Sequence, residues 1–151
     1  MFFGKRGELA LKEKDTDDLS RDLMENPNID SYISNHEFDF SDLSVTELLT
    51  AIYQKKSISK AALARKAGIS EVYLHQVFAG RRNPSRDRLL CICVGLDATL
   101  EETQRLLKQA GFAQLYPKIK RDAIISHGIV HHTPLAEIND KLFAENERTM
   151  F

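Results

Sequence analysis

Fifteen residues near the middle of the chain, from Leu63 to Val77, constrain the fold more than any other feature. Two short helices that meet at a tight turn leave room for only a small side chain where they approach, and Ala64 stands at that place. The turn needs a residue that tolerates a positive φ, which Gly68 supplies, and Ile69 fills the corner that follows. Apolar residues that then face each other across the turn are Leu63, Ala67, Leu74 and Val77. The segment predicts two packed helices joined by a tight turn.

Helix signals continue on both sides of this segment. Ser44 and Glu47 have the spacing of a capping box, and apolar residues then recur at helical intervals as far as Lys55 and Lys56. The same combination of a capping residue and helical apolar spacing predicts further helices at 59–67, 70–79, 85–94 and 99–110. Their predicted caps are Ser59, Ser70, Ser85 and Thr99, and Thr99 has capping-box spacing to Glu102. No alternating β pattern competes with these signals, so the sequence predicts an all-α fold.

The residues that precede this helical region form an acidic N-terminal leader, residues 1–43. Short helices are predicted at 17–24 and around Ile29 to Ile33, separated by the turn residues of Asn26-Pro27-Asn28. We expect the aromatic residues of the leader to lie on the main domain; they are Tyr32, Phe38 and Phe40.

The residues after 111 form a C-terminal extension with two predicted helices, at 118–127 and 134–144. The pattern Leu100-x-Glu102-x-Gln104-x-x-Leu107 recurs 35 residues later as Leu135-x-Glu137-x-Asn139-x-x-Leu142, either through duplication of a helical hairpin or by chance. The apolar residues of the extension exceed what two short helices bury between themselves. The extension therefore either packs on the main core or offers a surface for dimerisation or partner docking.

The net charge of −1 conceals a strong asymmetry along the chain. Residues 1–43 carry 5 basic and 11 acidic side chains, whereas residues 44–96 carry 9 basic and 3 acidic side chains. A positive middle segment of net charge +6 suits a polyanion. An acidic leader of net charge −6 suits a segment that repels or covers that positive surface.

Several classes of function find no support in the sequence. The longest apolar stretch, from Leu89 to Leu96, is far shorter than the ~20 residues of a membrane-spanning helix. Cys91 and Cys93 lack redox or zinc spacing and are expected to be reduced core residues of a cytoplasmic protein. His127, His131 and His132 lack further ligands at metal-binding spacing. We therefore predict no catalytic residues, no metal and no cofactor.

Residues 63–77 resemble the Cro/repressor-type, or XRE-like, helix–turn–helix family. A second segment, Gly80-Arg81-Arg82-Asn83-Pro84-Ser85-x-x-x-Leu89, resembles the link that joins the third and fourth helices in this family. The resemblance implies a five-helix domain over residues 44–111 that binds DNA and usually acts as a homodimer. The leader and the C-terminal extension, residues 112–151, lie outside it and resemble a bacterial subset of these proteins with an extra helical hairpin. The resemblance implies a bacterial or phage-borne protein.

The resemblance also implies that the third helix of the domain, residues 70–79, enters the major groove of double-stranded DNA. Gln76 would suit adenine, His75 a guanine acceptor and Val72 a thymine methyl group. Ser70 and the basic residues would suit phosphates, which dominate affinity. The residues predicted to bind DNA are Lys60, Ser70, Glu71, Val72, Tyr73, His75, Gln76, Arg81, Arg82 and Arg86, with Arg88 as a further phosphate contact.

One departure from the family pattern keeps an alternative open. Glu71 stands where the family usually has a neutral or basic polar residue, and a carboxylate near phosphate is repelled. The same fold could therefore serve as a protein-interaction module that no longer reads DNA, with Glu71 and Tyr73 in the contact. In a third interpretation, the acidic leader covers the basic surface and inhibits DNA binding until a partner or a modification releases it.

Overall fold

The computed structural model describes residues 16–35 and 44–151, and all regular secondary structure in these two ranges is helical. The all-α prediction is confirmed. The chain divides into two compact units, Met1–Asp42 and Leu43–Phe151.

The described part of the first unit consists of two short helices, α1 (Thr16–Glu25) and α2 (Ile29–Asn35), both as predicted. Asn28 Oδ1 accepts a hydrogen bond from the Asp30 N–H at 2.9 Å and so satisfies a free donor at the start of α2. Tyr32 is buried. Phe38 and Phe40 lie outside the described residues.

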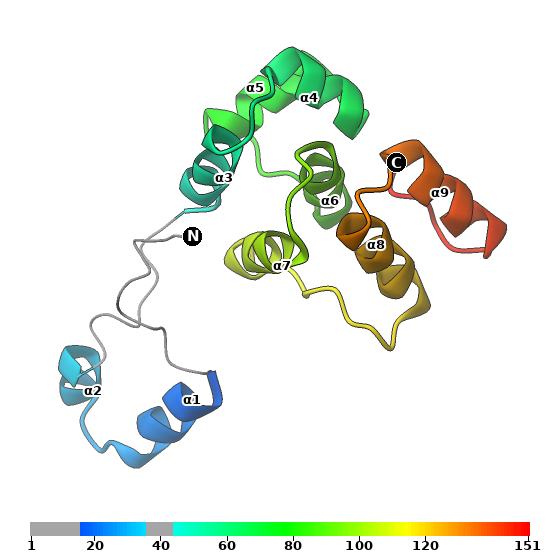
Figure 1. The fold of residues 1–151 in the computed structure, drawn as a ribbon. Helices are drawn as coiled ribbons and strands as arrows, with labels where there is room; N and C mark the ends of the chain where they lie inside the picture. The colour runs from blue at the N-terminus through cyan, green and yellow to red at the C-terminus, as the bar shows by residue number, and fades with distance from the viewer. Residues whose placement is uncertain (1–15, 36–43) are drawn as a thin grey trace. The chain divides into compact units, whose positions relative to one another are not determined.

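The second unit contains seven helices in its described residues (Figure 1). Every helix predicted between residues 44 and 144 is present. They are α3 (Val45–Gln54), α4 (Lys60–Ala67), α5 (Glu71–Phe78), α6 (Arg86–Gly95), α7 (Leu100–Gln109), α8 (Lys120–Val130) and α9 (Leu135–Ala144). α8 continues to Val130, three residues beyond its predicted end.

Local capping explains why most of these helices begin where they do. Ser44 and Glu47 form both hydrogen bonds of the predicted capping box, and Thr99 and Glu102 form a second one at the start of α7. α4, α5 and α6 begin after serines whose side chains accept a hydrogen bond from the backbone N–H three residues later; they are Ser59, Ser70 and Ser85.

The turn between α4 and α5 has the predicted geometry. Gly68 takes a left-handed conformation with φ of 68°, and Ala64 is buried where the helices approach. α6 crosses α4 equally closely, because a Cβ atom on Gly95 would lie 3.0 Å from Leu63 Cδ1 and 3.1 Å from Ala67 N. Small residues at these crossings let α4 pack against α5 and α6, which fixes the orientation of α5.

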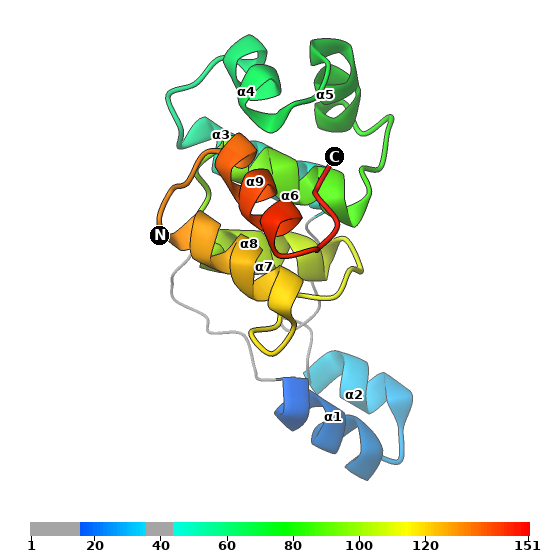
Figure 2. The same cartoon turned by 90° about the vertical axis from the view of Figure 1, so that its right-hand side faces the viewer.

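The C-terminal helices pack on the same core as the helices before them. Figure 2 shows α9 across α6 and beside α8, and both pairs are in contact. Ile129, Leu135, Ile138 and Leu142 are buried in one apolar cluster with the residues of α3 to α7. Of the two expectations for the extension, packing on the main core is therefore what the structure shows. Phe143, at the end of α9, remains 77% exposed.

Charged side chains reinforce the contact between α6 and the extension. Arg86 of α6 pairs with Asp122 of α8, with Nη2 and Oδ2 3.2 Å apart, and donates from Nε to the Ala113 carbonyl at 2.9 Å. Arg121 of α8 pairs with Asp87 of α6. The start of α6 is therefore fixed by two ion pairs that connect it to α8.

Candidate functional site

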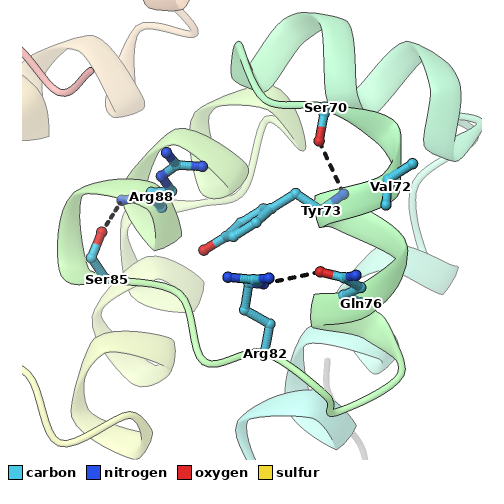
Figure 3. A pocket seen from close by; sticks show the side chains of 7 residues that line it. All are labelled: Ser70, Val72, Tyr73, Gln76, Arg82, Ser85 and Arg88. Atoms are coloured by element: carbon cyan, nitrogen blue, oxygen red, sulfur yellow. Dashed lines mark hydrogen bonds between the residues drawn. The ribbon is translucent and has the colours of Figure 1, made fainter.

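An open depression of about 500 Å³ lies between α5 and the start of α6 (Figure 3). Four of its lining residues come from α5 or its N-cap, and three come from the turn after α5 or from the first turn of α6. The lining residues are Ser70, Val72, Tyr73, Gln76, Arg82, Ser85 and Arg88. All but Ser85 were singled out from the sequence as DNA-binding residues.

Two helix N-termini contribute to this depression. Ser70 Oγ accepts from the Tyr73 N–H at 3.1 Å, and Ser85 Oγ accepts from the Arg88 N–H at 3.2 Å. These bonds hold the first turns of α5 and α6 in place, where free N–H groups and the helix dipoles favour anions. Ser85 was identified in the sequence only as a cap, although it has the same role as Ser70.

Tyr73 brings two arginines to the depression. The guanidinium carbon of Arg88 lies 4.7 Å from the centre of the Tyr73 ring, and that of Arg82 lies 5.3 Å from it. Both distances are within the range of cation–π attraction. The ring thus holds two positive charges, one from the turn that links α5 to α6 and one from the first turn of α6 (Figure 3).

Arg82 is also bound to α5 directly. Its Nε–H donates to Gln76 Oε1 at 2.9 Å (Figure 3). Six residues and a turn separate these two side chains in sequence. Sequence reasoning treated them as independent contacts, because helical periodicity alone does not show where the turn places Arg82.

The outer face of α5 is open to solvent, as predicted. Val72 is 69% exposed, and its apolar side chain stands beside the depression. Glu71 and His75 lie one helical turn apart with Oε2 and Nε2 separated by 3.3 Å. The Glu71 carboxylate therefore has a hydrogen-bond partner on its own helix, to which His75 Nε2 donates when that nitrogen carries the proton.

The remaining predicted residues occupy different environments. Arg81 is exposed beyond the end of α5. Lys60, at the start of α4, places Nζ 4.9 Å from the centre of the Phe78 ring and 5.7 Å from that of Tyr53. Arg86 does not line the depression, because its guanidinium is engaged with Asp122 and with the backbone before α8.

Other chemistry is poorly supported by the described residues. They contain no cluster of three or more His, Cys, Asp or Glu side chains that could hold a metal ion, and the rings of His127 and His131 simply contact each other, 4.2 Å apart. Burial raises the pKa of the Cys91 thiol to about 11 and that of Cys93 to about 12, so both thiols are protonated at neutral pH. None of the described helices is long and apolar enough to cross a bilayer.

Comparison with known proteins agrees with the geometry of α4 and α5. Residues 46–106 match a family model described as a helix-turn-helix domain. No curated protein and no solved structure matches the chain. The matched segment begins in α3 and ends in α7, and it contains the whole depression.

Proposed function

We propose that this chain, whose residues 46–106 belong to a helix-turn-helix family of the XRE-like group, is a sequence-specific DNA-binding regulator of transcription. The observation that carries the proposal is the depression between α5 and α6. There two helix N-termini, two arginines and the exposed face of α5 meet in one place. This combination suits a polyanion whose bases are read beside its phosphates.

In the proposed complex, α5 lies in the major groove. Val72 suits contact with a thymine methyl group, because it is apolar and 69% exposed. Ser70 and Ser85 mark helix starts where backbone N–H groups suit phosphates, and Arg81 and Arg88 add salt-dependent attraction. Glu71 suits the amino group of cytosine, the one base group in the major groove of a G·C pair that a carboxylate accepts from.

We further propose that two copies bind together. A single α5 of eight residues reads only a few base pairs, and paired half-sites one helical turn apart supply the missing specificity. The predicted homodimer, the absence of catalysis and the cytoplasmic location belong to the same proposal. Buried, reduced cysteines are consistent with that location.

The test is selection of the full-length protein on a randomised duplex pool, followed by sequencing of the retained DNA. We expect a motif with two-fold symmetry, whose half-site spacing reports the dimer geometry. Retention without any motif would leave only non-specific binding. No retention at low salt, by the full chain or by residues 44–151, would contradict DNA binding altogether.

The second candidate is a protein-interaction module with the same fold. The observation in its favour is the outer face of α5, where exposed Val72 lies next to the Glu71–His75 pair. An apolar side chain flanked by an acidic one suits a protein surface that is itself apolar and basic. Loss of all duplex binding together with a retained fold would favour this candidate.

A further inference from the structure

Gln76 and Arg82 form a single hydrogen-bonded unit beside the exposed face of α5. Arg82 Nε–H donates to Gln76 Oε1 at 2.9 Å. A guanidinium group has donors and no acceptor, so the carboxamide atom that faces it is the oxygen. The amino group of Gln76, Nε2, therefore points away from Arg82 (Figure 3).

Tyr73 holds the other side of this unit. The Arg82 guanidinium carbon lies 5.3 Å from the centre of the Tyr73 ring, so the group is fixed both at Nε and by the ring. Within residues 16–35 and 44–151, the structure gives no hydrogen-bond partner to the two Nη groups of Arg82 or to Nε2 of Gln76. The unit thus offers the donors of Arg82 Nη and Gln76 Nε2 in one place, while its acceptor, Gln76 Oε1, is already bound to Arg82.

Such a unit distinguishes the two purines in the major groove. Guanine presents two acceptors, N7 and O6, whereas adenine presents the acceptor N7 and the donor N6. A free glutamine reads adenine because its oxygen accepts from N6 while its amino group donates to N7. In this protein, the oxygen of Gln76 already accepts from Arg82. A second bond to that oxygen would bring the amino hydrogens of adenine beside a guanidinium cation.

We propose that Gln76 and Arg82 read one base together and that this base is guanine. The proposal rests on the proposed DNA-binding function and assigns Arg82 a part in base recognition in addition to its attraction for phosphate. By itself Gln76 would select adenine, whereas the pair is expected to select guanine. Arg82 sets the specificity of Gln76 by occupying its acceptor.

The decisive variant is Arg82→Ala, because it releases the Gln76 oxygen and changes no residue of α5 itself. We expect its preferred base at one position of the half-site to change from guanine to adenine. Arg88→Ala is the matched control, since Arg88 contacts the same Tyr73 ring but has no bond to Gln76. We expect Arg88→Ala to weaken binding to all duplexes and to keep the preference for guanine.

The experiment compares selection on the randomised pool by the wild-type chain, Arg82→Ala, Arg88→Ala and Gln76→Ala. Binding to duplexes that differ only at the affected position then gives the size of the effect. For the wild-type chain we expect discrimination of roughly 5- to 150-fold between guanine and adenine, the range of one bidentate contact. Circular dichroism of each variant checks that the helices are retained.

The outcomes separate this proposal from the proposed function. A symmetric motif that lacks guanine at the position changed by Gln76→Ala would overturn the guanine assignment and leave DNA binding intact. An unchanged preference for guanine in Arg82→Ala would overturn the joint reading. Failure of the wild-type chain to retain any duplex would overturn both proposals together.

Discussion

Arg121 and Asp87 form an ion pair with Nη1 and Oδ1 3.0 Å apart, and the arginine side chain is only 9% exposed. Arg121 also donates from Nε to the Arg148 carbonyl at 2.7 Å and from Nη2 to the Thr149 carbonyl at 3.2 Å. One side chain of α8 thereby joins the first turn of α6 to the residues after α9. Ser85 and Arg88 of the candidate site belong to that same turn of α6. The C-terminal extension therefore helps to hold these two residues in position.

We expect Arg121→Met to lower the free energy of unfolding by about 1–3 kcal/mol, because the Arg148 and Thr149 carbonyls lose their donor and Asp87 keeps only Arg148 as a partner. Arg148→Met is the matched control, because Arg148 contacts the same Asp87 at 3.4 Å but is 74% exposed. It should cost about 1 kcal/mol or less. Urea denaturation measures both, and equal losses would contradict the assignment of Arg121 as the main connection.

Gly128 in α8 allows the close approach of α9. A Cβ atom at this position would lie 2.5 Å from Ile138 Cδ1 and 2.6 Å from Ile138 Cγ1. Gly128→Ala therefore combines overpacking, which costs about 1–3 kcal/mol, with a gain in helix propensity of about 1 kcal/mol. We expect a net loss of stability of up to about 2 kcal/mol in urea denaturation. The loss of stability caused by Ile138→Ala should be smaller in the Gly128→Ala background than in the wild type, because the smaller side chain removes the clash. Equal losses in the two backgrounds would contradict the clash.

The lowered pKa of Glu102 makes the stability of the fold depend on pH. Burial by itself would raise its pKa, but hydrogen bonds from Lys55 Nζ and from the Thr99 N–H, with the charge of Lys56, bring the pKa below its usual value. A carboxyl group whose pKa is lower in the folded state stabilises the fold above its unfolded pKa, about 4.3. That stabilisation is lost as the pH falls through the folded pKa.

We therefore expect Glu102→Gln to be destabilised relative to the wild type at pH 7 and to approach it in stability as the pH falls below about 4. Glu101→Gln is the control, since Glu101 lies in the same helical turn and is exposed. Denaturation curves measured across this pH range check the prediction. A constant difference between wild type and Glu102→Gln at all pH values would contradict it.

Arg81 is expected to contact phosphate without reading a base. Arg81→Ala should weaken binding to every duplex by a similar factor and reduce the slope of log K against log salt by about 1. Lys118→Ala removes a positive charge that is also exposed, in the C-terminal extension, and should leave the slope unchanged. Titrations at several salt concentrations measure the slopes, and identical slopes for wild type and Arg81→Ala would remove Arg81 from the interface.

The acidic leader is expected to oppose DNA binding through its charge. Deletion of residues 1–43, which carry a net charge of −6, should tighten binding at low salt, and the difference should shrink as salt screens the charges. A full-length variant with Asp17, Asp18, Asp22 and Asp30 changed to Asn should reproduce part of the effect. Equal affinities of the full chain and of residues 44–151 at low salt would exclude this form of autoinhibition.

The sequence by itself determined the helices and the turn between α4 and α5, because these depend on neighbours a few residues apart. The serine caps, the capping boxes of Ser44 and Thr99 and the left-handed Gly68 are all local features, and each is present as predicted. Most residues of the candidate site could be predicted from the sequence for the same reason, because helical periodicity decides which side chains of α5 face outward.

Only the tertiary structure decided which of those side chains bind each other. Arg86 and Asp122 are 36 residues apart, and their ion pair removes Arg86 from the depression. The turn after α5 brings Arg82 back onto Gln76, and the core of α3 to α7 extends to cover Ile138 and Leu142. Contacts of this kind depend on how whole helices pack. An arginine side chain is long and flexible, so it binds a carboxylate, carbonyl or carboxamide oxygen that the packing brings within its reach.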